Sequence, residues 1–234
     1  MGEVNCLSKE EAIDCVADLW SLLTEEEQTR FSEHLSVRRF RKSEPIYREG
    51  ESPDELICLL SGKVKIYRDG VGGRSQIIRV IKPVEYFGYR AYLAGEPYVT
   101  GAAAFEASDV CFIPMTIVEE TMRHNNALAM FFVRQLAVDL GIADRRTVNL
   151  TQKHIRGRLA ESLLFLRDTY GVEEDESTLS IYLSREDLAS LSNMTASNAT
   201  RTLSNFAAEK LIAIDGRKIK LIDVERLGQI SRIG

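Results

Sequence analysis

"LSREDLASLSNMTASNATRTLSNFAAEKL" (Leu183–Leu211) holds two short helical patterns separated by a polar break at residues 192–195. The first pattern has an apolar face made of Leu188, Ala189 and Leu191. Asn193 suits the left-handed conformation that a tight turn between helices requires, and Thr195 is a suitable N-cap for the second helix. The stretch therefore predicts two helices braced at a fixed angle, as in a helix-turn-helix.

The second pattern has an apolar face made of Ala199, Leu203 and Phe206, and an outer face without an acidic residue. Arginine can donate two hydrogen bonds to guanine in the major groove, and small polar side chains reach bases or phosphates. An ordinary αα-hairpin with a solvated face would explain two such helices on their own. As a nucleic-acid interface, the expected contact residues are Arg185, Thr195, Ala196, Ser197, Asn198, Thr200 and Arg201.

A hairpin pattern follows directly after these helices. "LIAIDGRKIKLID" (Leu211–Asp223) alternates about Asp215-Gly216, which is a strong hairpin signal. Upstream, a helix with an apolar face at residues 159–166 and a short strand at Leu179–Leu183 are expected. Helices followed by a hairpin make a winged helix-turn-helix, which favours double-stranded DNA as a partner, with Lys218 of the wing touching phosphate.

Composition places the chain among ordinary globular proteins. The 234 residues carry a net charge of −5, but residues 151–234 hold 12 basic and 12 acidic side chains, so the acidity lies in the first part. No apolar stretch approaches the length of a membrane span, and Met1–Cys6 has neither a basic start nor an apolar core. We therefore expect a cytoplasmic protein with no membrane partner. Phosphate loops, zinc spacings and nucleophile elbows are missing, so we expect no enzyme.

The pattern of residues 37–115 predicts many short strands separated by Gly, Pro and Asp, which favours a small β-barrel or β-roll. From 116 to 150 the pattern becomes helical, with apolar positions in alternating steps of three and four. Such a seam favours a helix that pairs with its twin in a homodimer, although a helix packed on its own barrel has a similar pattern. The predicted dimer contacts are Phe132, Leu136, Leu140 and Ala143.

In order and spacing, these segments resemble the CRP/FNR family of bacterial transcription factors. "REGESPDELICLLSGKVKIY" resembles the β-roll pattern with Gly50 and Gly62 at its glycines, and Gly88 matches the glycine before the ligand cassette. "GRLAESLLFL" (Gly157–Leu166) resembles the first helix of the DNA-binding domain. The resemblance implies an α+β fold of three parts. These are an N-terminal helix and double-stranded β-helix (β-roll) sensor domain at 1–115, a dimerisation helix at 116–150 and a winged helix-turn-helix at 151–234.

The resemblance breaks at the cyclic-AMP pocket. Tyr89 stands where cyclic-AMP-binding members have a glutamate for the ribose, and Val99-Thr100 replaces their phosphate-binding Arg-Ser pair. Asp139 stands where an arginine supports that glutamate. A buried phosphate without a cationic partner is costly, so we expect cyclic AMP not to bind.

This cassette, the segment around and after Gly88, is instead rich in tyrosine at residues 86, 89, 92 and 98. Such a composition fits either a barrel core or an aromatic effector pocket. In the second case an unknown small-molecule effector would be held by Tyr89, Arg90, Tyr98, Val99 and Thr100, with Ala143 and Asp144 from the long helix. The resemblance also implies RNA polymerase as a partner, as for an activator of the family, and a hinge at residues 150–153. Ser197 departs from the family's usual glutamate, which implies a different half-site.

Iron-sulfur members of the family use four cysteines. Cys6, Cys15 and Cys111 match the first, third and fourth of these positions, but Lys9 stands where the second cysteine should be, and such a cluster needs four thiolates. We therefore expect no cluster. Haem held by His34, His124 or His154 is unsupported, because isolated histidines are usually structural, and the cofactor stays unknown. The alternatives left open are a redox-, haem- or NO-responsive regulator and an effector-binding β-roll that acts through protein contacts.

Overall fold

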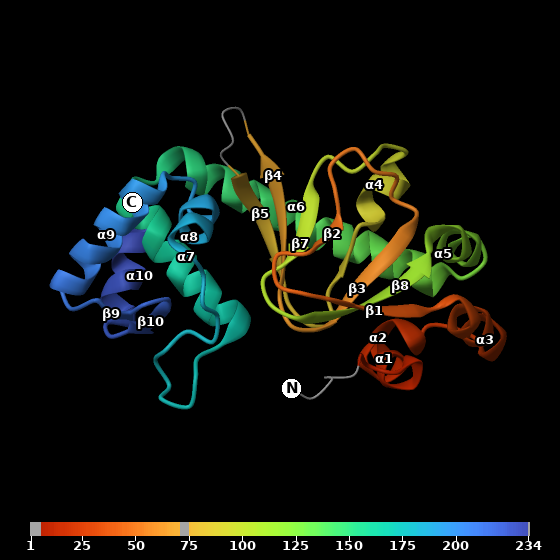
Figure 1. Cartoon of the computed structure of the whole chain (residues 1–234). Coiled ribbons are helices and arrows are strands. Elements are labelled where there is room, and N and C mark those ends of the chain that lie inside the picture. Colours follow the sequence, from red (N-terminus) through yellow and green to blue (C-terminus); the bar gives the residue numbers. More distant parts are fainter. Residues whose placement is uncertain (1–5, 71–74, 234) are drawn as a thin grey trace. The chain divides into compact units, whose positions relative to one another are not determined.

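The computed structural model describes residues 6–70 and 75–233 (Figure 1). Two compact units divide the chain: unit 1 consists of Met1–Asp69 and Ile78–Leu140, and unit 2 of Gly70–Ile77 and Gly141–Gly234. Met1–Asn5, part of the segment inspected for a secretory signal, lie outside the described residues.

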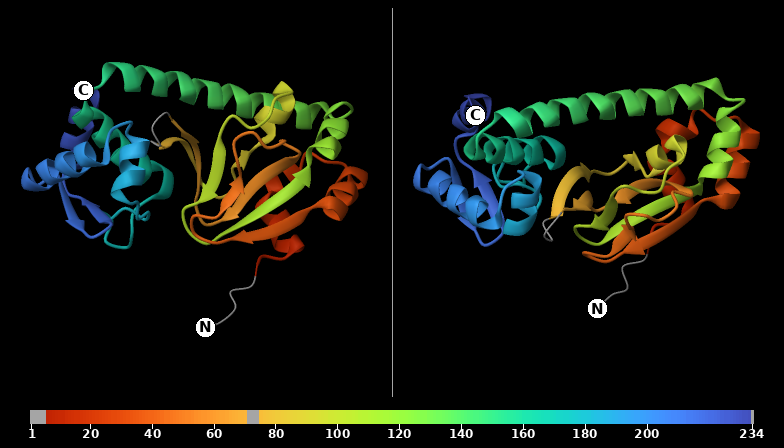
Figure 2. Two further views of the ribbon diagram at one scale, coloured as in Figure 1. Left: turned by 45° about the horizontal axis from the view of Figure 1, so that its top comes forward. Right: turned by 90° about the horizontal axis from the view of Figure 1, so that it is seen from above.

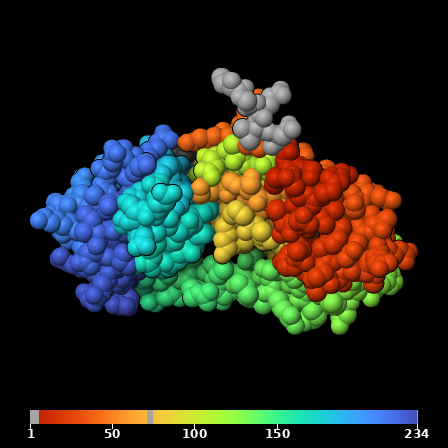
Figure 3. Space-filling view, turned by 90° about the horizontal axis from the view of Figure 1, so that it is seen from below, coloured from red at the N-terminus to blue at the C-terminus, as the bar shows by residue number. Residues whose placement is uncertain are grey.

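Three short helices begin unit 1, where the sequence predicted one helical region. They are α1 (Lys9–Cys15), α2 (Ala17–Trp20) and α3 (Glu25–His34). Ser8 with Glu11 and Thr24 with Glu27 form capping boxes at the starts of α1 and α3, which satisfy backbone N–H groups there. In the space-filling view these helices, red to orange, form part of the surface of unit 1 (Figure 3).

Two four-stranded sheets form the β-roll. One sheet has the order β1-β8-β3-β6 and the other β2-β7-β4-β5. The strands are β1 (Ser36–Phe40), β2 (Pro45–Tyr47), β3 (Glu55–Ser61), β4 (Val64–Asp69), β5 (Ser75–Ile81), β6 (Tyr86–Phe87), β7 (Gly101–Ala104) and β8 (Ser108–Pro114). The predicted β-roll architecture is confirmed.

Alternating residues of β3 and β8 divide the core of unit 1 into two clusters, because successive side chains of a strand point to opposite faces. Ile57 and Leu59 join a cluster with side chains from both sheets, which fills the roll. Leu56 and Cys58 join the other cluster, with residues of α1, α3, α5 (Met115–Met122) and α6 (Asn126–Gln152). The helices therefore cover the outer face of one sheet.

The helical region expected from 116 to 150 is two helices rather than one. After α5 the chain turns, and the side-chain oxygen of Asn125 accepts a hydrogen bond from the backbone N–H of Leu128 at 3.0 Å. This bond caps the start of α6, which then continues for 27 residues without a break (Figure 2). A short helix, α4 (Tyr89–Ala94), lies in the cassette.

By length and composition α6 is apolar enough to cross a membrane, the one such helix within residues 6–70 and 75–233. The sequence had predicted no such stretch. Two observations favour another role for its apolar surface. The charged residues Arg134 and Asp139 lie within its apolar sequence, and charges at the centre of a bilayer are costly. Leu128 and Phe132 are buried in the core of unit 1.

Unit 2 holds the predicted winged helix-turn-helix. It consists of α7 (Ile155–Tyr170), α8 (Arg185–Leu191), α9 (Ala196–Ala208), β9 (Ile212–Asp215), β10 (Lys218–Leu221) and α10 (Val224–Ile233). The strand expected at Leu179–Leu183 is replaced by two isolated bridges, Val172↔Leu179 and Thr178↔Lys220. Only residues 177–179 lie beside β10, whereas Ile181 and Leu183 turn their side chains into the core.

Serine hydroxyls join the parts of unit 2 at the C-terminal end of α8. The Ser190 hydroxyl donates to the Ser75 carbonyl oxygen and accepts from the Ile77 N–H, both at 2.7 Å. The Ser192 hydroxyl donates to the hydroxyl of Ser162 in α7 at 2.8 Å, and Ser192 is buried. Because buried polar groups are costly when unpaired, these bonds fix the position at which α8 ends.

Asn193 lies in the turn between α8 and α9 with φ of +49° and an exposed side chain. The left-handed conformation is strained for β-branched residues and free for glycine. We expect Asn193→Val to lower the free energy of unfolding by about 1–2 kcal/mol and Asn193→Gly to change it little. Urea unfolding followed by circular dichroism measures both. Equal losses for the two variants would contradict this role of the backbone conformation.

Candidate functional site

Side-chain caps position both helices of the helix-turn-helix. The Ser184 hydroxyl accepts from the Asp187 N–H at 3.0 Å at the start of α8. The Thr195 hydroxyl accepts from the Asn198 N–H at 3.2 Å at the start of α9, as the sequence predicted. Ala199, Leu203 and Phe206 are buried beneath α9, so the opposite side of the helix is fixed outward.

The outward side of α9 brings together most of the predicted contact residues. Thr195, Ser197, Thr200 and Arg201 are exposed, and Ala196 and Asn198 are partly exposed. Within the described residues Arg201 has no ion-pair partner, and no acidic side chain occurs in α9. The positive end of the α9 dipole lies at its N-terminus, beside Thr195 and Ala196. This surface suits a ligand that carries negative charge and also presents hydrogen-bond donors and acceptors.

Ser204 and Asn205 extend the same face by one turn and are also exposed. The sequence analysis missed them, although they lie three and four residues after Arg201 and therefore share its side of the helix. The Ser204 hydroxyl donates to the Thr200 carbonyl oxygen at 3.0 Å, which leaves its oxygen able to accept.

Arg185 lies against the wing. Its Nη2 donates to the carbonyl oxygen of Gly216 in the hairpin turn at 2.9 Å, while its Nη1 is buried without a hydrogen-bond partner among the described residues. Gly216 has φ of +56°. Arg185 thus ties the β9–β10 turn to the start of α8.

Lys218 is also engaged within unit 2. Its Nζ lies 3.6 Å from Glu173 Oε2 and 5.3 Å from the centre of the Tyr182 ring. A cation over an aromatic face beside a carboxylate is held electrostatically on two sides.

In the cassette, Gly88 has φ of +87° and precedes α4. A Cβ at this position would lie 3.0 Å from the Tyr98 hydroxyl oxygen and 3.1 Å from Ile57 Cδ1. A side chain here would therefore be strained by the backbone conformation and by crowding. The glycine lets the chain turn closely over the interior of the roll.

Within unit 1, the side chains predicted to form an effector pocket are not brought together. Tyr89 is buried in the cluster beneath the helices, with its ring 5.1 Å from that of Phe132. Tyr98 is buried in the other cluster, inside the roll. Arg90 is half exposed and pairs with Glu96 at 2.8 Å. Val99 is exposed and Thr100 is partly exposed; Ala143 and Asp144 belong to unit 2.

Aromatic rings occupy the interior of the roll. Tyr98 stacks on Tyr47 with ring centres 3.8 Å apart and an interplanar angle of 14°, and Tyr47 also lies 6.3 Å from Phe87. Burial raises the pKa of both tyrosines, so the phenols stay neutral. The space behind Gly88 is thereby filled from β2, β6 and the segment after α4.

The charge pattern beside Tyr89 differs from the one the resemblance implied. Asp139 on α6 forms an ion pair with Arg79 on β5 at 2.5 Å, and both are partly buried. Asp139, which stands at the position of the family's arginine, is thus paired with a cation on the sheet, while Tyr89 occupies the position of the family's glutamate. A partly buried pair of this kind is costly to break by removing one partner.

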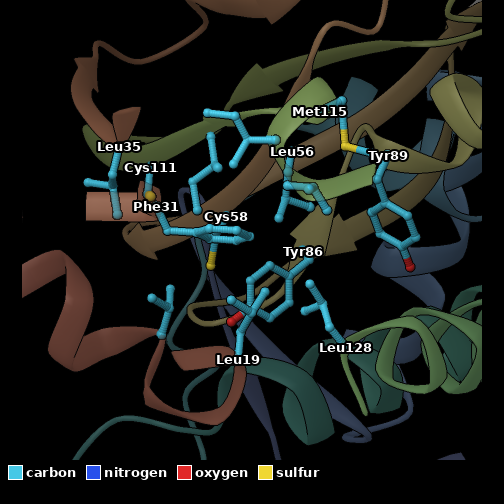
Figure 4. Packing of buried hydrophobic residues seen from close by; sticks show 14 of the residues in the cluster. Leu19, Phe31, Leu35, Leu56, Cys58, Tyr86, Tyr89, Cys111, Met115 and Leu128 are labelled. Atoms are coloured by element: carbon cyan, nitrogen blue, oxygen red, sulfur yellow. The ribbon is translucent and has the colours of Figure 1, made fainter. Parts of the chain in front are cut away.

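Cys58 and Cys111 are cross-strand partners in the core, where Cys58 packs with Tyr86 and Leu19 (Figure 4). Burial raises the pKa of the Cys58 thiol well above its usual range and that of Cys111 to about 12. Cys15 is partly buried beside this cluster, and Cys6 is exposed. No group of three or more His, Cys, Asp or Glu residues suited to a metal ion occurs within residues 6–70 and 75–233.

The exposed apolar residues of α6 lie on a different side of the helix from part of the predicted seam. Phe132 lies in the core, and Leu136 is half buried against it, whereas Leu140 and Ala143 are exposed. The outward positions advance in steps of three and four and are Met130, Val133, Ala137, Leu140, Asp144, Thr147 and Thr151. These seven residues are called the outer seam below.

Two family models match the chain. The cyclic nucleotide-binding domain matches residues 37–125, and the Crp-like helix-turn-helix domain matches residues 157–230. The first match covers the β-roll with α4 and α5, and the second covers most of α7 to α10.

Curated relatives match along most of their length. The transcriptional regulator LdrP of Thermus thermophilus is 28% identical over 191 residues, which are 82% of this chain and 94% of the relative. The CRP-like cAMP-activated global transcriptional regulator of Mycobacterium tuberculosis is 24% identical over 194 residues, 82% of this chain and 87% of the relative.

Among solved structures, FixK2 from Bradyrhizobium japonicum superimposes with a TM-score of 0.75 at 24% identity, covering 84% of this chain and 96% of that one. At this identity the superposition shows a shared fold. With both domain models matched in order, the chain belongs to the CRP/FNR family of transcription regulators, and its C-terminal helix-turn-helix binds DNA.

Proposed function

We propose that this regulator reads an operator sequence through the exposed face of α9. The observation that carries the proposal is the outward face of α9, which has no acidic residue and holds Arg201 near the middle of the helix. Ser197 and Asn198 are small enough to let the helix approach base edges closely, and Arg201 can bind guanine O6 and N7 together. The proposed contact set is Thr195, Ala196, Ser197, Asn198, Thr200 and Arg201, extended by Ser204 and Asn205.

Arg185 and Lys218 have a different place in this proposal. Arg185 positions the wing through the Gly216 carbonyl oxygen, and its guanidinium is therefore engaged before DNA arrives. Lys218 reaches phosphate from β10 once it leaves Glu173. Contacts to phosphate set register and affinity and carry little sequence information.

We also propose that the protein acts as a homodimer through the outer seam of α6. Val133 and Leu140 are 52% and 63% exposed, values that are high for apolar side chains on a 27-residue helix. The seam spans 22 residues from Met130 to Thr151, and its first and last Cα atoms are about 32 Å apart along the helix. Pairing with a second copy would bury this stripe and place two recognition helices about one turn of DNA apart, ~34 Å.

The β-roll would respond to an effector other than cyclic AMP. Val99 offers no charge to a cyclic phosphate, and the Tyr47–Tyr98 stack fills space inside the roll. An effector can change DNA affinity only by its differential affinity for the two conformations. Tyr89, Arg90, Tyr98 and Thr100 remain the proposed contact residues, and binding there would require the aromatic rings to rearrange. RNA polymerase is the proposed protein partner, and the cytoplasm the proposed location.

The first prediction concerns dimerisation. Val133→Asp combined with Leu140→Asp should produce monomers, because four carboxylates would enter an apolar interface. Val138→Asp is the matched control, since Val138 is 58% exposed but lies outside the outer seam. Sedimentation velocity measures both. A Val133/Leu140 variant that remains dimeric, or a Val138 variant that dissociates equally, would contradict the proposed seam.

The second prediction concerns Arg201. Once an operator has been selected from random DNA, Arg201→Ala should weaken operator binding by about 1–3 kcal/mol at its base pair, with a smaller loss on random duplex. Fluorescence anisotropy with both duplexes measures the difference. Arg232→Ala removes one exposed charge outside this face and controls for net charge. Equal losses on operator and random DNA would contradict base reading by Arg201.

The third prediction concerns cyclic AMP. Isothermal calorimetry should detect no binding, because the phosphate would lack a cationic partner. A dissociation constant on the order of 1 μM, a binding free energy of about −8 kcal/mol, would contradict the interpretation that the cassette cannot hold a cyclic phosphate.

A further inference from the structure

Both lysines of β10 are paired with acids from one loop of unit 2. Ile219 and Leu221 are buried, so Lys218 and Lys220 project from the opposite face of the strand. Lys218 Nζ lies 3.6 Å from Glu173 Oε2, and Lys220 Nζ lies 3.2 Å from Asp175 Oδ2. The loop from Gly171 to Thr178, called the acidic loop below, therefore covers the cationic face of the wing with carboxylates.

Backbone hydrogen bonds hold the acidic loop and the residue after it against the wing. The Leu221 N–H donates to the Ser177 carbonyl oxygen at 2.8 Å, and the Leu179 N–H donates to the Ile219 carbonyl oxygen at 2.9 Å. These bonds act as a partial third strand beside β10. The carboxylates are thus carried by a fixed part of the domain.

The loop also orients its own carboxylate. Asp175 accepts from the N–H groups of Ser177 at 3.1 Å and Thr178 at 2.8 Å, and from the Thr178 hydroxyl at 2.8 Å. These hydrogen bonds, with a contribution from Lys220, hold the pKa of Asp175 well below its usual range. Asp175 therefore stays ionised at neutral pH and keeps its negative charge beside Lys220.

The acidic loop accounts for the charge balance of the DNA-binding segment. Residues 151–234 hold 12 basic and 12 acidic side chains, and Glu173, Glu174, Asp175 and Glu176 are four of those acids. Without these four acids, residues 151–234 would carry a net charge of +4, from 12 basic and 8 acidic side chains. Because non-specific DNA affinity comes from cations that neutralise phosphates, the loop opposes that affinity.

We propose that the acidic loop is an intramolecular competitor for DNA phosphate at the wing, with Glu173 occupying Lys218 until DNA displaces it. The inference rests on DNA contact by the wing, as proposed above. A phosphate that approaches Lys218 has to replace Glu173 and is repelled by its carboxylate. The wing therefore contributes little to binding of random DNA, and discrimination depends more on base contacts from α9.

The test compares two neutral variants on a random-sequence duplex. Glu173→Gln should bind about 2- to 5-fold tighter at low salt, the range expected from one exposed ion pair. The slope of log K against log salt concentration should steepen by about 0.9, one additional phosphate contact. Glu174→Gln is the matched control, since Glu174 is exposed in the same loop and has no ion-pair partner among the described residues. It should leave the slope unchanged.

A double-mutant cycle separates the ion pair from a general charge effect. Lys218→Gln should weaken binding little in the wild-type background and should cancel the gain in the Glu173→Gln background. Thermal melting by circular dichroism checks that each variant is folded. If Glu173→Gln and Glu174→Gln behave alike, or if Lys218→Gln costs the same in both backgrounds, the competitor role is overturned. Wild-type protein that binds no duplex at all would instead count against DNA binding itself.

Discussion

The packing of Phe132 against Tyr89 fixes the rotation of α6, and the proposed use of this helix depends on that rotation. Phe132 is buried in the core of unit 1, and Phe131 packs edge-on against it with ring centres 5.4 Å apart. A helix whose one side is anchored this way must present the opposite side outward. In α6 that opposite side is apolar at Met130, Val133 and Leu140. One contact inside the sensor unit thereby selects the stripe available to a second copy.

The same region holds aromatic and charged side chains where the family resemblance implied a cyclic-AMP pocket. The roll interior is filled by the Tyr47–Tyr98 stack, and Arg79 pairs with Asp139 between β5 and α6. Removing either charge would leave its partner partly buried and unpaired. A ligand that entered the interior of the roll would have to move aromatic rings. The β-roll fold is therefore present with aromatic side chains packed in its interior.

In the DNA-binding unit, the residues proposed to read bases and the lysines proposed to contact phosphate lie on different elements. The outward face of α9 is free of acids, whereas the lysines of β10 are covered by carboxylates of the acidic loop. Phosphate contacts strengthen binding to any sequence, and base contacts distinguish sequences. A near-neutral domain with an uncovered recognition face would favour selectivity over affinity. Arg185, engaged with the Gly216 carbonyl oxygen, keeps the wing in place.

The sequence by itself determined the elements whose signals are local. Thr195 as N-cap, the left-handed Asn193, the Asp215-Gly216 hairpin and the alternating strands of the roll were all predictable, because caps, turns and periodicity depend on neighbours in the chain. The tertiary structure decided which side of an element faces what. It turned Phe132 inward, separated Tyr89 from Tyr98, reduced the strand at Leu179–Leu183 to bridges and paired Glu173 with Lys218. These outcomes depend on contacts between residues distant in sequence. Apolar periodicity does not identify which distant residue a side chain packs against, and a charged residue in the sequence does not show which opposite charge it will meet.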